Sequence, residues 1–396
     1  MANKSLGAAK KAKNDEFYTQ YSDIQKEIEA YLEYDENTFN NKVVYCNCDD
    51  PFESNFFRYF VLNFKRLGLK QLITTSYKPS PIANTELVLQ PSLFPDYEER
   101  VMSNPLEPKG RPKITANKFI ISSVGDIDGD GSFTLQDIAE QLKANKHNEW
   151  APLKGEGDFR SPECVELLKQ ADIVITNPPF SLFREYIKQL FEYSKKFIVL
   201  SNKGAVLYKE VFPLLQDNKL WSGRTSWSGG MWFETTNLND VDKIIDGKNM
   251  KNVPSIWLTN IDHGRRHQQL TLMTVADNLK FNKKMKDKIA YDKYDNYNAI
   301  EVSFTNAIPS DYDGIMGVPS TFLDKYNPDQ FEIVGMCENL DLYKLKTKKY
   351  TTAECKQAYF NKFGKAGVYD MNASGVILVG GRLEKVYQRV LIRRKK

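Results

Sequence analysis

Residues 171–180 read Ala-Asp-Ile-Val-Ile-Thr-Asn-Pro-Pro-Phe, and this stretch is the strongest indication of the fold. Ile173 to Thr176 form a short, β-branched apolar run that is typical of a buried central strand. Pro178 and Pro179 end this strand because a proline has no N–H to donate to a sheet ladder. Asn177 is therefore expected at the carboxyl end of the strand, where open α/β sheets bind their ligands.

The segments before and after this strand predict an α/β protein with a parallel sheet. Residues 43–48 read as a strand, residues 56–67 as a helix and residues 71–77 as a second strand. A strand, a helix and a strand within about 35 residues make a βαβ unit. The helix 56–67 has Ser54 or Asn55 as its cap and Gly68 as its stop. The other predicted elements are a helix around Ile24, Ile28 and Tyr31, a helix over 161–169 with Ser161 as cap and Pro162 in its first turn, a helix from Ser181 to about Lys195, and strands at 118–123, 197–201 and 256–261.

Asn177, Pro178, Pro179 and Phe180 resemble the catalytic motif of amino-methyltransferases that use S-adenosylmethionine, and their chemistry suits methyl transfer to an amine. The exocyclic amine of adenine is a poor nucleophile because its lone pair is delocalised into the ring. The side-chain oxygen of Asn177 and the carbonyl of Pro178 would accept its two hydrogens and turn the lone pair towards an incoming methyl group. Phe180 offers a flat face on which a flipped-out base can stack. The alternative interpretation is a Pro-Pro turn that Asn177 caps, with Phe180 packed on the core.

The composition indicates a globular protein without a membrane segment. The 396 residues, 41% of them hydrophobic and 27% charged, are enough for a sizeable core and two lobes. No run of about 18 apolar residues and no signal peptide is found, and the N-terminus is polar and lysine-rich. An odd number of scattered cysteines predicts free thiols and a reducing cytoplasm. These are Cys46, Cys48, Cys164, Cys337 and Cys355, of which the first two are expected to pack in the core rather than to bind a metal.

The net charge of +4 argues only weakly for nucleic acid, and its distribution is more informative. Three basic clusters are candidates for phosphate contacts, although a solvated surface is the usual explanation of such runs. They are an N-terminal arm with Lys4, Lys10, Lys11 and Lys13, the segment His263-Gly-Arg265-Arg266-His267, and a C-terminal tail of Arg393, Arg394, Lys395 and Lys396. Gly264 favours a loop for the second cluster, and a loop argues against a metal site at the two histidines.

Residues 126–137 match the spacing of a calcium-binding loop. Asp126, Asp128, Asp130, Gly131 and Asp137 fall on the ligand and glycine positions of an EF-hand. The element before this loop reads as a strand rather than a helix, and no partner hand is found. We therefore prefer an acidic turn that leads into a helix at 135–142, and we expect no metal site.

The last parts of the chain predict a second lobe. Residues 221–235 mix aromatic residues, glycine and Arg224, and they fit either a β-hairpin packed on the sheet or a loop at the base or cofactor. Strands are expected at 316–322 and 331–336. The predicted organisation is a flexible basic arm at 1–13, a catalytic domain at 14–289 and an α+β lobe at 290–396 that reads the target sequence.

Several segments together resemble the EcoRI-type adenine-specific DNA methyltransferases, a family with a Rossmann-like fold that binds S-adenosylmethionine (SAM). The matching segments are 14–19, 45–51, 157–162, 177–183, 295–302 and 308–335. By this resemblance, Asn177, Pro178, Pro179 and Phe180 hold the base, and the SAM contacts are Phe17, Tyr18 and Thr19 at the methionine part, Asp49, Asp50 and Pro51 at the first turn, and Asp158 and Phe159 near the adenine.

Two features depart from the broader methyltransferase pattern. Residues 53–55 are Glu, Ser and Asn, where glycines usually let the backbone approach the cofactor. Ser76 and Tyr77, rather than an acidic residue, end the second strand, so no carboxylate is found there for the ribose hydroxyls. The SAM contacts are therefore less firmly indicated than the base-holding tetrad.

The expected function is site-specific methylation of adenine N6 in double-stranded DNA, by base flipping and direct transfer from SAM. Arg224, Arg265 and Arg266 are the side chains best suited to contact DNA. We expect a cytoplasmic monomer with no membrane contact. Its functional partner is expected to be a cognate restriction endonuclease. The alternatives are methylation of RNA adenine or of a protein amide nitrogen, and a DNA-binding relative that has lost catalysis.

Overall fold

The computed structural model describes residues 19–48, 54–76, 116–126, 133–134, 137–138, 147–235 and 238–395. The chain divides into two compact units. The N-terminal unit comprises Met1–Glu210 and Ser222–Gly264, and the C-terminal unit comprises Val211–Trp221 and Arg265–Lys396. The domain boundary expected at residue 290 thus lies inside the C-terminal unit.

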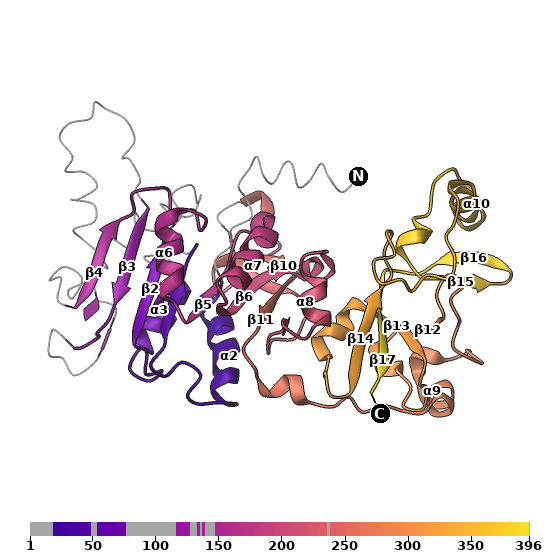
Figure 1. Ribbon diagram of the computed structural model, residues 1–396, viewed down its shortest axis with the longest axis horizontal. Coiled ribbons are helices and arrows are strands. Elements are labelled where there is room, and N and C mark those ends of the chain that lie inside the picture. Colours follow the sequence, from indigo (N-terminus) through magenta and orange to yellow (C-terminus); the bar gives the residue numbers. More distant parts are fainter. Residues whose placement is uncertain are drawn as a thin grey trace. The chain divides into compact units, whose positions relative to one another are not determined.

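A mixed eight-stranded sheet forms the centre of the N-terminal unit (Figure 1). The strand order is β4 (Asn148–Pro152), β3 (Asn117–Ile121), β2 (Gln71–Thr75), β1 (Val43–Cys46), β5 (Ile173–Thr176), β6 (Lys196–Asn202), β11 (Ser255–Thr259) and β7 (Trp221–Ser222). Strands β2, β1, β5 and β6 are parallel, whereas β3, β4 and β11 run antiparallel to their neighbours. The predicted α/β class and the parallel βαβ unit are therefore confirmed.

Helices cover both faces of this sheet, because successive side chains of each buried strand point to opposite faces. Val44 and Cys46 belong to one buried cluster with residues of α2 (Tyr21–Leu32) and α3 (Asn55–Leu62). Phe197, on β6, packs on the opposite side, where its ring centroid lies 5.7 Å from that of Phe191 in α7 (Phe183–Glu192). The core thus lies in two apolar layers, one on each side of the parallel strands.

Helix boundaries follow the predicted caps. Ser54 accepts hydrogen bonds from the first N–H groups of α3, and Ser161 does the same for α6 (Pro162–Gln170). Helix α3 ends at Leu62 rather than near Gly68, because Asn63 leaves the helical region and its side chain donates to the carbonyl of Tyr59 at 2.8 Å. The other predicted helices and strands that fall within the described ranges are present with ends shifted by one to three residues, whereas most of the helix predicted at 135–142 lies outside these ranges.

Residues 221–235 do not form the hairpin that was one of the two alternatives. Strand β7 belongs to the large sheet, whereas β8 (Met231–Glu234) pairs with β10 (Lys248–Val253), which also pairs with β9 (Lys243–Ile245).

The loop between β7 and β8 is held by Glu27 of α2, which is fully buried. The N–H groups of Arg224 and Thr225 donate to this carboxylate at 2.7 and 2.8 Å, and the Thr225 hydroxyl donates at 2.7 Å. Gly223 permits the approach, since a Cβ there would lie 2.2 Å from Glu27 Oε1.

The C-terminal unit is built on a smaller sheet with the order β12 (Ala299–Glu301), β13 (Ile315–Pro319), β17 (Arg389–Arg394) and β14 (Phe331–Met336). Strand β14 confirms the strand predicted at 331–336, whereas the strand predicted at 316–322 ends with β13 at Pro319 and is followed by a 3₁₀ helix, Ser320–Lys325. A hairpin of β15 (Val376–Val379) and β16 (Arg382–Lys385) and the helices α8 (Phe212–Gln216), α9 (Val275–Phe281) and α10 (Thr352–Phe363) complete the unit. Gln216 joins α8 to β14 through a 2.9 Å hydrogen bond to the carbonyl of Val334.

Within the described ranges, none of the helices combines the length and the apolar character that a membrane crossing requires. All five cysteines carry free thiols. Cys46 is buried in β1 as expected, whereas Cys48 lies past the end of β1 and is only partly buried, so the prediction of core packing is wrong for Cys48.

Replacing Glu27 by alanine is expected to lower the free energy of unfolding by about 2 kcal/mol or more, because three donors of the 223–230 loop would lose a buried acceptor. Urea unfolding followed by tryptophan fluorescence measures this change. Glu33→Ala, an exposed position at the end of the same helix, is the matched control and should change little. Equal, small effects of both substitutions would show that the carboxylate does not hold the loop.

Candidate active site

The carboxyl ends of β1 and β5 lie side by side. The two strands are parallel, with Val44 opposite Ile173 and Tyr45 opposite Val174, so the chain leaves both at the same edge of the sheet. The hydroxyl of Thr176, the last residue of β5, donates to the backbone carbonyl of Asn47, which directly follows β1. Two segments 129 residues apart in the sequence are thereby joined where open α/β sheets bind ligands.

The tetrad 177–180 leaves β5 at this edge. Asn177 is 9% exposed and Pro178 is buried, whereas Pro179 and Phe180 are partly exposed. The carbonyl of Pro179 accepts the N–H of Leu182 at 3.0 Å and begins a single 3₁₀ turn, Phe180–Leu182, before α7. Phe180 packs in part against the core cluster, and the rest of its ring is accessible. The tetrad is therefore a rigid turn with an accessible aromatic ring.

The segment 157–159 reaches the same edge from the far side of β1. Gly157 has φ +78°, and a Cβ there would lie 1.9 Å from the carbonyl oxygen of Ser76, at the end of β2. Asp158 accepts the backbone N–H and the guanidinium of Arg160, which holds the pKa of its carboxyl below the usual range. Phe159 is buried and packs edge-on against Tyr186 with ring centroids 5.0 Å apart. Asp158 is thus an anion at neutral pH beside the end of β2.

Thr19 is the one residue of the N-terminal motif that lies within the described ranges. Its carbonyl accepts a 2.8 Å hydrogen bond from Asn55, the first residue of α3, which follows β1. Cys48, just past β1, has φ +63°, a left-handed conformation that is uncommon outside glycine and clusters at functional sites. Four segments that are distant in sequence thus meet at this edge of the sheet. The remaining predicted contacts, Phe17, Tyr18, Asp49, Asp50 and Pro51, lie outside the described residues.

Asn47 and Tyr186 are two residues of this site that the sequence analysis did not single out. The Tyr186 hydroxyl, on α7, donates to the side-chain oxygen of Asn47, and both residues are buried. The position of Asn47 directly after a buried strand was a usable signal. Tyr186 looked like any other member of the apolar face of its helix, so its polar contact could not be foreseen.

The basic cluster at 263–267 differs from the predicted exposed loop. His263 is 2% exposed, with its Nε2 atom 2.8 Å from the carbonyl oxygen of Ser222 and its ring edge-on to Tyr31. Residues Gly264–His267 form a 3₁₀ turn. His263 is therefore a core residue of the N-terminal unit, so the interpretation as a surface residue is wrong for His263, whereas His267 is exposed.

The three arginines proposed for DNA contact have different surroundings. Arg224 is exposed in the 223–230 loop of the N-terminal unit. Arg265, in the C-terminal unit, forms a 2.8 Å ion pair with Asp324 and is mostly buried. Arg266, in the same unit, stacks on Trp221 with its guanidinium carbon 3.7 Å from the ring centroid. Arg224 and Arg265–Arg266 thus belong to separate units.

The other charged candidates are mostly engaged in the fold or outside the described ranges. Arg393, from the basic tail, lies in β17 and pairs with Glu332 at 3.2 Å, whereas the N-terminal arm is outside the described residues. Asp137 accepts the N–H and hydroxyl of Thr134 at 2.7 and 3.0 Å, as in a turn, and residues 127–132 are likewise not described. Among the residues that are described, no group of three His, Cys, Asp or Glu side chains is placed to hold a metal.

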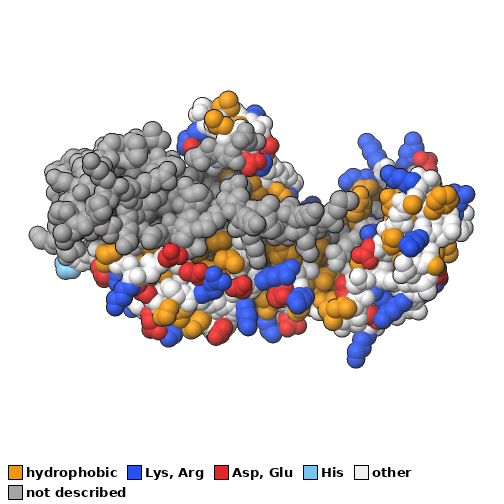
Figure 2. Space-filling view, turned by 90° about the horizontal axis from the view of Figure 1, so that it is seen from above, with side chains coloured by type: hydrophobic (Ala, Val, Ile, Leu, Met, Phe, Trp, Pro, Cys, Tyr) orange, Lys and Arg blue, Asp and Glu red, His pale blue; other side chains and the backbone are white. Residues whose placement is uncertain are grey.

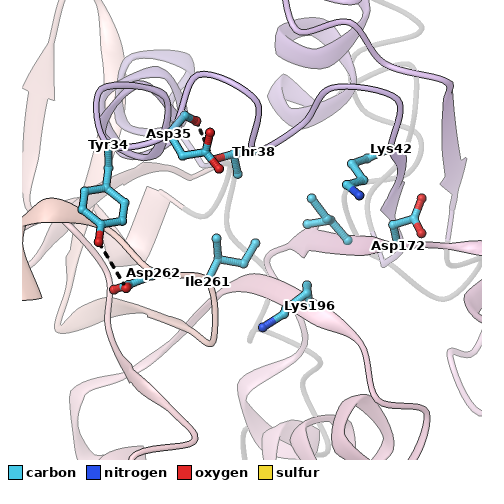
Figure 3. A pocket seen from close by; sticks show the side chains of 9 residues that line it. Tyr34, Asp35, Thr38, Lys42, Asp172, Lys196, Ile261 and Asp262 are labelled. Atoms are coloured by element: carbon cyan, nitrogen blue, oxygen red, sulfur yellow. Dashed lines mark hydrogen bonds between the residues drawn. The ribbon is translucent and has the colours of Figure 1, made fainter.

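A charged hollow of about 360 Å³ lies at the opposite edge, where β1, β5 and β6 begin (Figure 3). Its carboxylates serve the fold: Asp172 accepts the N–H of Val43 at 2.8 Å, and Asp262 accepts the hydroxyl of Tyr34 at 3.4 Å. The hollow is lined by Tyr34, Asp35, Thr38, Lys42, Asp172, Ile173, Lys196, Ile261 and Asp262. The amino ends of the strands carry none of the predicted site residues, so the candidate active site is at the carboxyl edge.

The family described as "Adenine-specific methyltransferase EcoRI" matches residues 5–395. The chain belongs to this family.

Its curated relatives match along most of their own length. The chain is 40% identical to the Type II methyltransferase M.EcoRI of Escherichia coli over 86% of this chain and 91% of that protein. It is 34% identical to the Type II methyltransferase M.MpnI of Mycoplasma pneumoniae, over 86% of this chain and 89% of the relative. The Type II methyltransferase M.MgeORF184P of Mycoplasma genitalium is 36% identical, with 86% and 90% covered. No solved structure matches the chain.

Gly157→Ala is expected to displace the 157–159 segment, because the new Cβ would meet the Ser76 carbonyl oxygen and would need a left-handed backbone. We expect SAM affinity, measured by titration calorimetry, to fall about 10-fold or more. Gly155→Ala is the matched control, since a Cβ at Gly155 would meet nothing within 4 Å. Unchanged SAM affinity in both variants would separate this segment from cofactor binding.

Proposed function

We propose that this protein is a site-specific DNA methyltransferase that transfers a methyl group from SAM to N6 of adenine in double-stranded DNA. Membership of the adenine-specific EcoRI family supports the reaction. The observation that carries the assignment of the site is the parallel pairing of β1 with β5, which brings the start of the tetrad at Asn177 next to Asn47.

SAM is proposed to bind over the carboxyl ends of β1 and β2, in a Rossmann-like manner. The parallel strands with helices on both faces are the kind of sheet that binds nucleotide-like ligands at this edge. The residues fit such a ligand: Thr19 is buried, and its hydroxyl has no hydrogen-bond partner in the part of the chain that the structure describes. Thr19, Asp158 and residues 49–51, which lie outside the described ranges, would hold SAM, whose sulfonium supplies an activated methyl group.

The tetrad would prepare the amine of the target adenine for transfer. The side-chain oxygen of Asn177 and the carbonyl of Pro178 accept the two hydrogens of the amine and favour a tetrahedral nitrogen. The two prolines restrict the backbone, so both acceptors are held before the base arrives. The accessible part of the Phe180 ring provides the stacking surface for a flipped base.

The proposal extends to the partners of the enzyme. Double-stranded DNA is the substrate, and the C-terminal residues from 290 onwards read the target sequence. The protein acts as a monomer beside a cognate restriction endonuclease. The names of the three relatives, each a Type II methyltransferase, support the pairing with an endonuclease.

The reaction is tested by offering SAM with a labelled methyl group to DNA, RNA and protein in parallel. The proposal expects the label in DNA alone, recovered as N6-methyladenine by mass spectrometry of the nucleosides. Methylation-sensitive sequencing of the same DNA identifies the site. Label in RNA adenine or in protein amide nitrogen, with none in DNA, would replace this function by one of the alternatives.

Asn177→Ala should lower the rate of methyl transfer by at least about 100-fold, the order of effect of removing one preorganised hydrogen-bonding group. SAM affinity, measured by calorimetry, should stay within about threefold of wild type, since the residue acts on the base. Asn177→Asp, which keeps a side-chain oxygen at the same position, should recover part of the activity. Full activity in the alanine variant would refute the role of Asn177.

The Phe180 ring should be replaceable by another aromatic ring but not by a methyl group. Phe180→Ala is expected to cost about 1–3 kcal/mol of base binding, whereas Phe180→Tyr and Phe180→Trp retain most of it. The affinity is measured for a duplex with an abasic site opposite the target adenine, in which the adenine has no pairing partner. The rate of methyl transfer is measured alongside. If all three variants behave alike, the ring is a packing residue of the core.

A further inference from the structure

The C-terminal unit contains a pocket of about 820 Å³ whose residues have been given no individual role so far. The pocket combines cationic side chains with aromatic rings, and all its lining residues belong to this one unit. It is lined by Lys288, Asp292, Glu301, Ser303, Phe304, Pro319, Thr321, Tyr369, Ile377, Lys385, Val386, Tyr387 and Arg389.

A buried ion pair lines this pocket. Glu301 and Arg389 are 3% and 7% exposed, with Arg389 Nε 3.1 Å from both carboxylate oxygens and Nη2 2.6 Å from Oε1. The hydroxyls of Tyr294 and Ser303 also donate to this carboxylate. Glu301 therefore fixes the plane of the guanidinium while engaging two of its five N–H bonds. A planar guanidinium held in this way is suited to a pair of acceptors such as the edge of a guanine or a phosphate.

Aromatic rings and lysines line the pocket together with the Glu301–Arg389 ion pair. Tyr387 is 82% exposed and Phe304 is 37% exposed, so both rings are accessible to a ligand. Lys284 holds its ammonium group 4.7 Å from the centroid of the Phe304 ring. On a DNA duplex, lysines beside a tyrosine can bind phosphates while the ring packs on a sugar and its hydroxyl contacts a phosphate or a base edge. Figure 2 shows Lys and Arg side chains alongside hydrophobic ones on the face of this unit turned to the viewer.

A lysine-rich segment adjoins the pocket through Lys288. Residues 280–288 read Lys-Phe-Asn-Lys-Lys-Met-Lys-Asp-Lys, with five lysines and one acidic residue. All five lysines are exposed, and Met285 anchors the segment because it is buried. The sequence analysis did not single out this run because its charge is diluted in the total of the chain. Its position beside a fixed arginine distinguishes it from an ordinary solvated surface.

We propose that the C-terminal unit binds DNA through the lysines of residues 280–288, which contact phosphates, and through the adjoining pocket, where Arg389 and Tyr387 contact a base. This inference rests on the proposed function, because the ligand is the DNA that the enzyme methylates. Phosphate contacts supply affinity that depends on salt, whereas contacts to bases supply specificity.

The phosphate contacts are tested with the triple variant Lys284→Gln, Lys286→Gln and Lys288→Gln. The affinity for a DNA duplex is measured by fluorescence anisotropy over a range of salt concentrations. Each lost phosphate contact should reduce the slope of log affinity against log salt by about 0.9. The matched control is Lys42→Gln, Lys65→Gln and Lys70→Gln, which removes the same charge from exposed positions of the N-terminal unit. Its slope should stay close to that of wild type.

The pocket is tested separately with Tyr387→Ala. Loss of the ring and hydroxyl of Tyr387 should lower DNA affinity about 5-fold or more at every salt concentration without changing the slope. Phe360→Ala, at a ring 54% exposed on α10 of the same unit, is the control and should leave affinity unchanged.

The outcomes separate this inference from the proposed function. If wild type methylates adenine in DNA but the triple lysine variant has the same salt slope as its control, the inference is overturned and the proposed function stands. If wild type binds DNA without methylating it, the proposed function fails while the comparison of slopes still decides where DNA binds. A reduced slope in the lysine variant, with weakened binding in Tyr387→Ala, supports the inference.

Discussion

The site depends on the parallel pairing of two four-residue strands, β1 and β5. Parallel neighbours end at one edge of the sheet, and the hydrogen bond from Thr176 to Asn47 fixes the two exits to each other. The segments that carry Thr19 and Gly157 then reach the same edge through contacts to Asn55 and Ser76. A slip of one residue in this register would turn Asn177 to the other face of the sheet and separate it from the segments that carry Thr19 and Gly157.

A buried carboxylate organises a loop or a pocket in each unit. In the N-terminal unit, Glu27 accepts hydrogen bonds from the loop that carries Arg224, and burial raises the pKa of Glu27 above its ordinary value. In the C-terminal unit, Glu301 orients Arg389 in the wall of a pocket. Such groups are costly to bury unless every acceptor is satisfied, so they fix one arrangement of the segments bound to them. Both are scaffold residues that act through their neighbours.

Local signals in the sequence predicted much of the site, whereas tertiary pairing could not be predicted. The strand Ile173–Thr176 and the cap at Ser161 were found because an apolar run, prolines and a capping serine act within a few residues. The partner of β8 was not found, because its pairing with β10 rather than β7 depends on the fold as a whole. His263 was misjudged for the same reason: its neighbours in sequence are basic, but its contacts in space are Tyr31 and Ser222.

The central claim is that cofactor and target base meet at the carboxyl edge of β1 and β5. A crystal structure of the protein with a stable SAM analogue and a duplex that contains the unmethylated target adenine tests this location. We predict that the analogue lies over the ends of β1 and β2. The adenine amine should lie within hydrogen-bonding distance of the Asn177 side-chain oxygen and the Pro178 carbonyl. An analogue or a flipped base bound elsewhere, such as in the hollow beside Asp172 and Lys196 at the opposite edge, would contradict it.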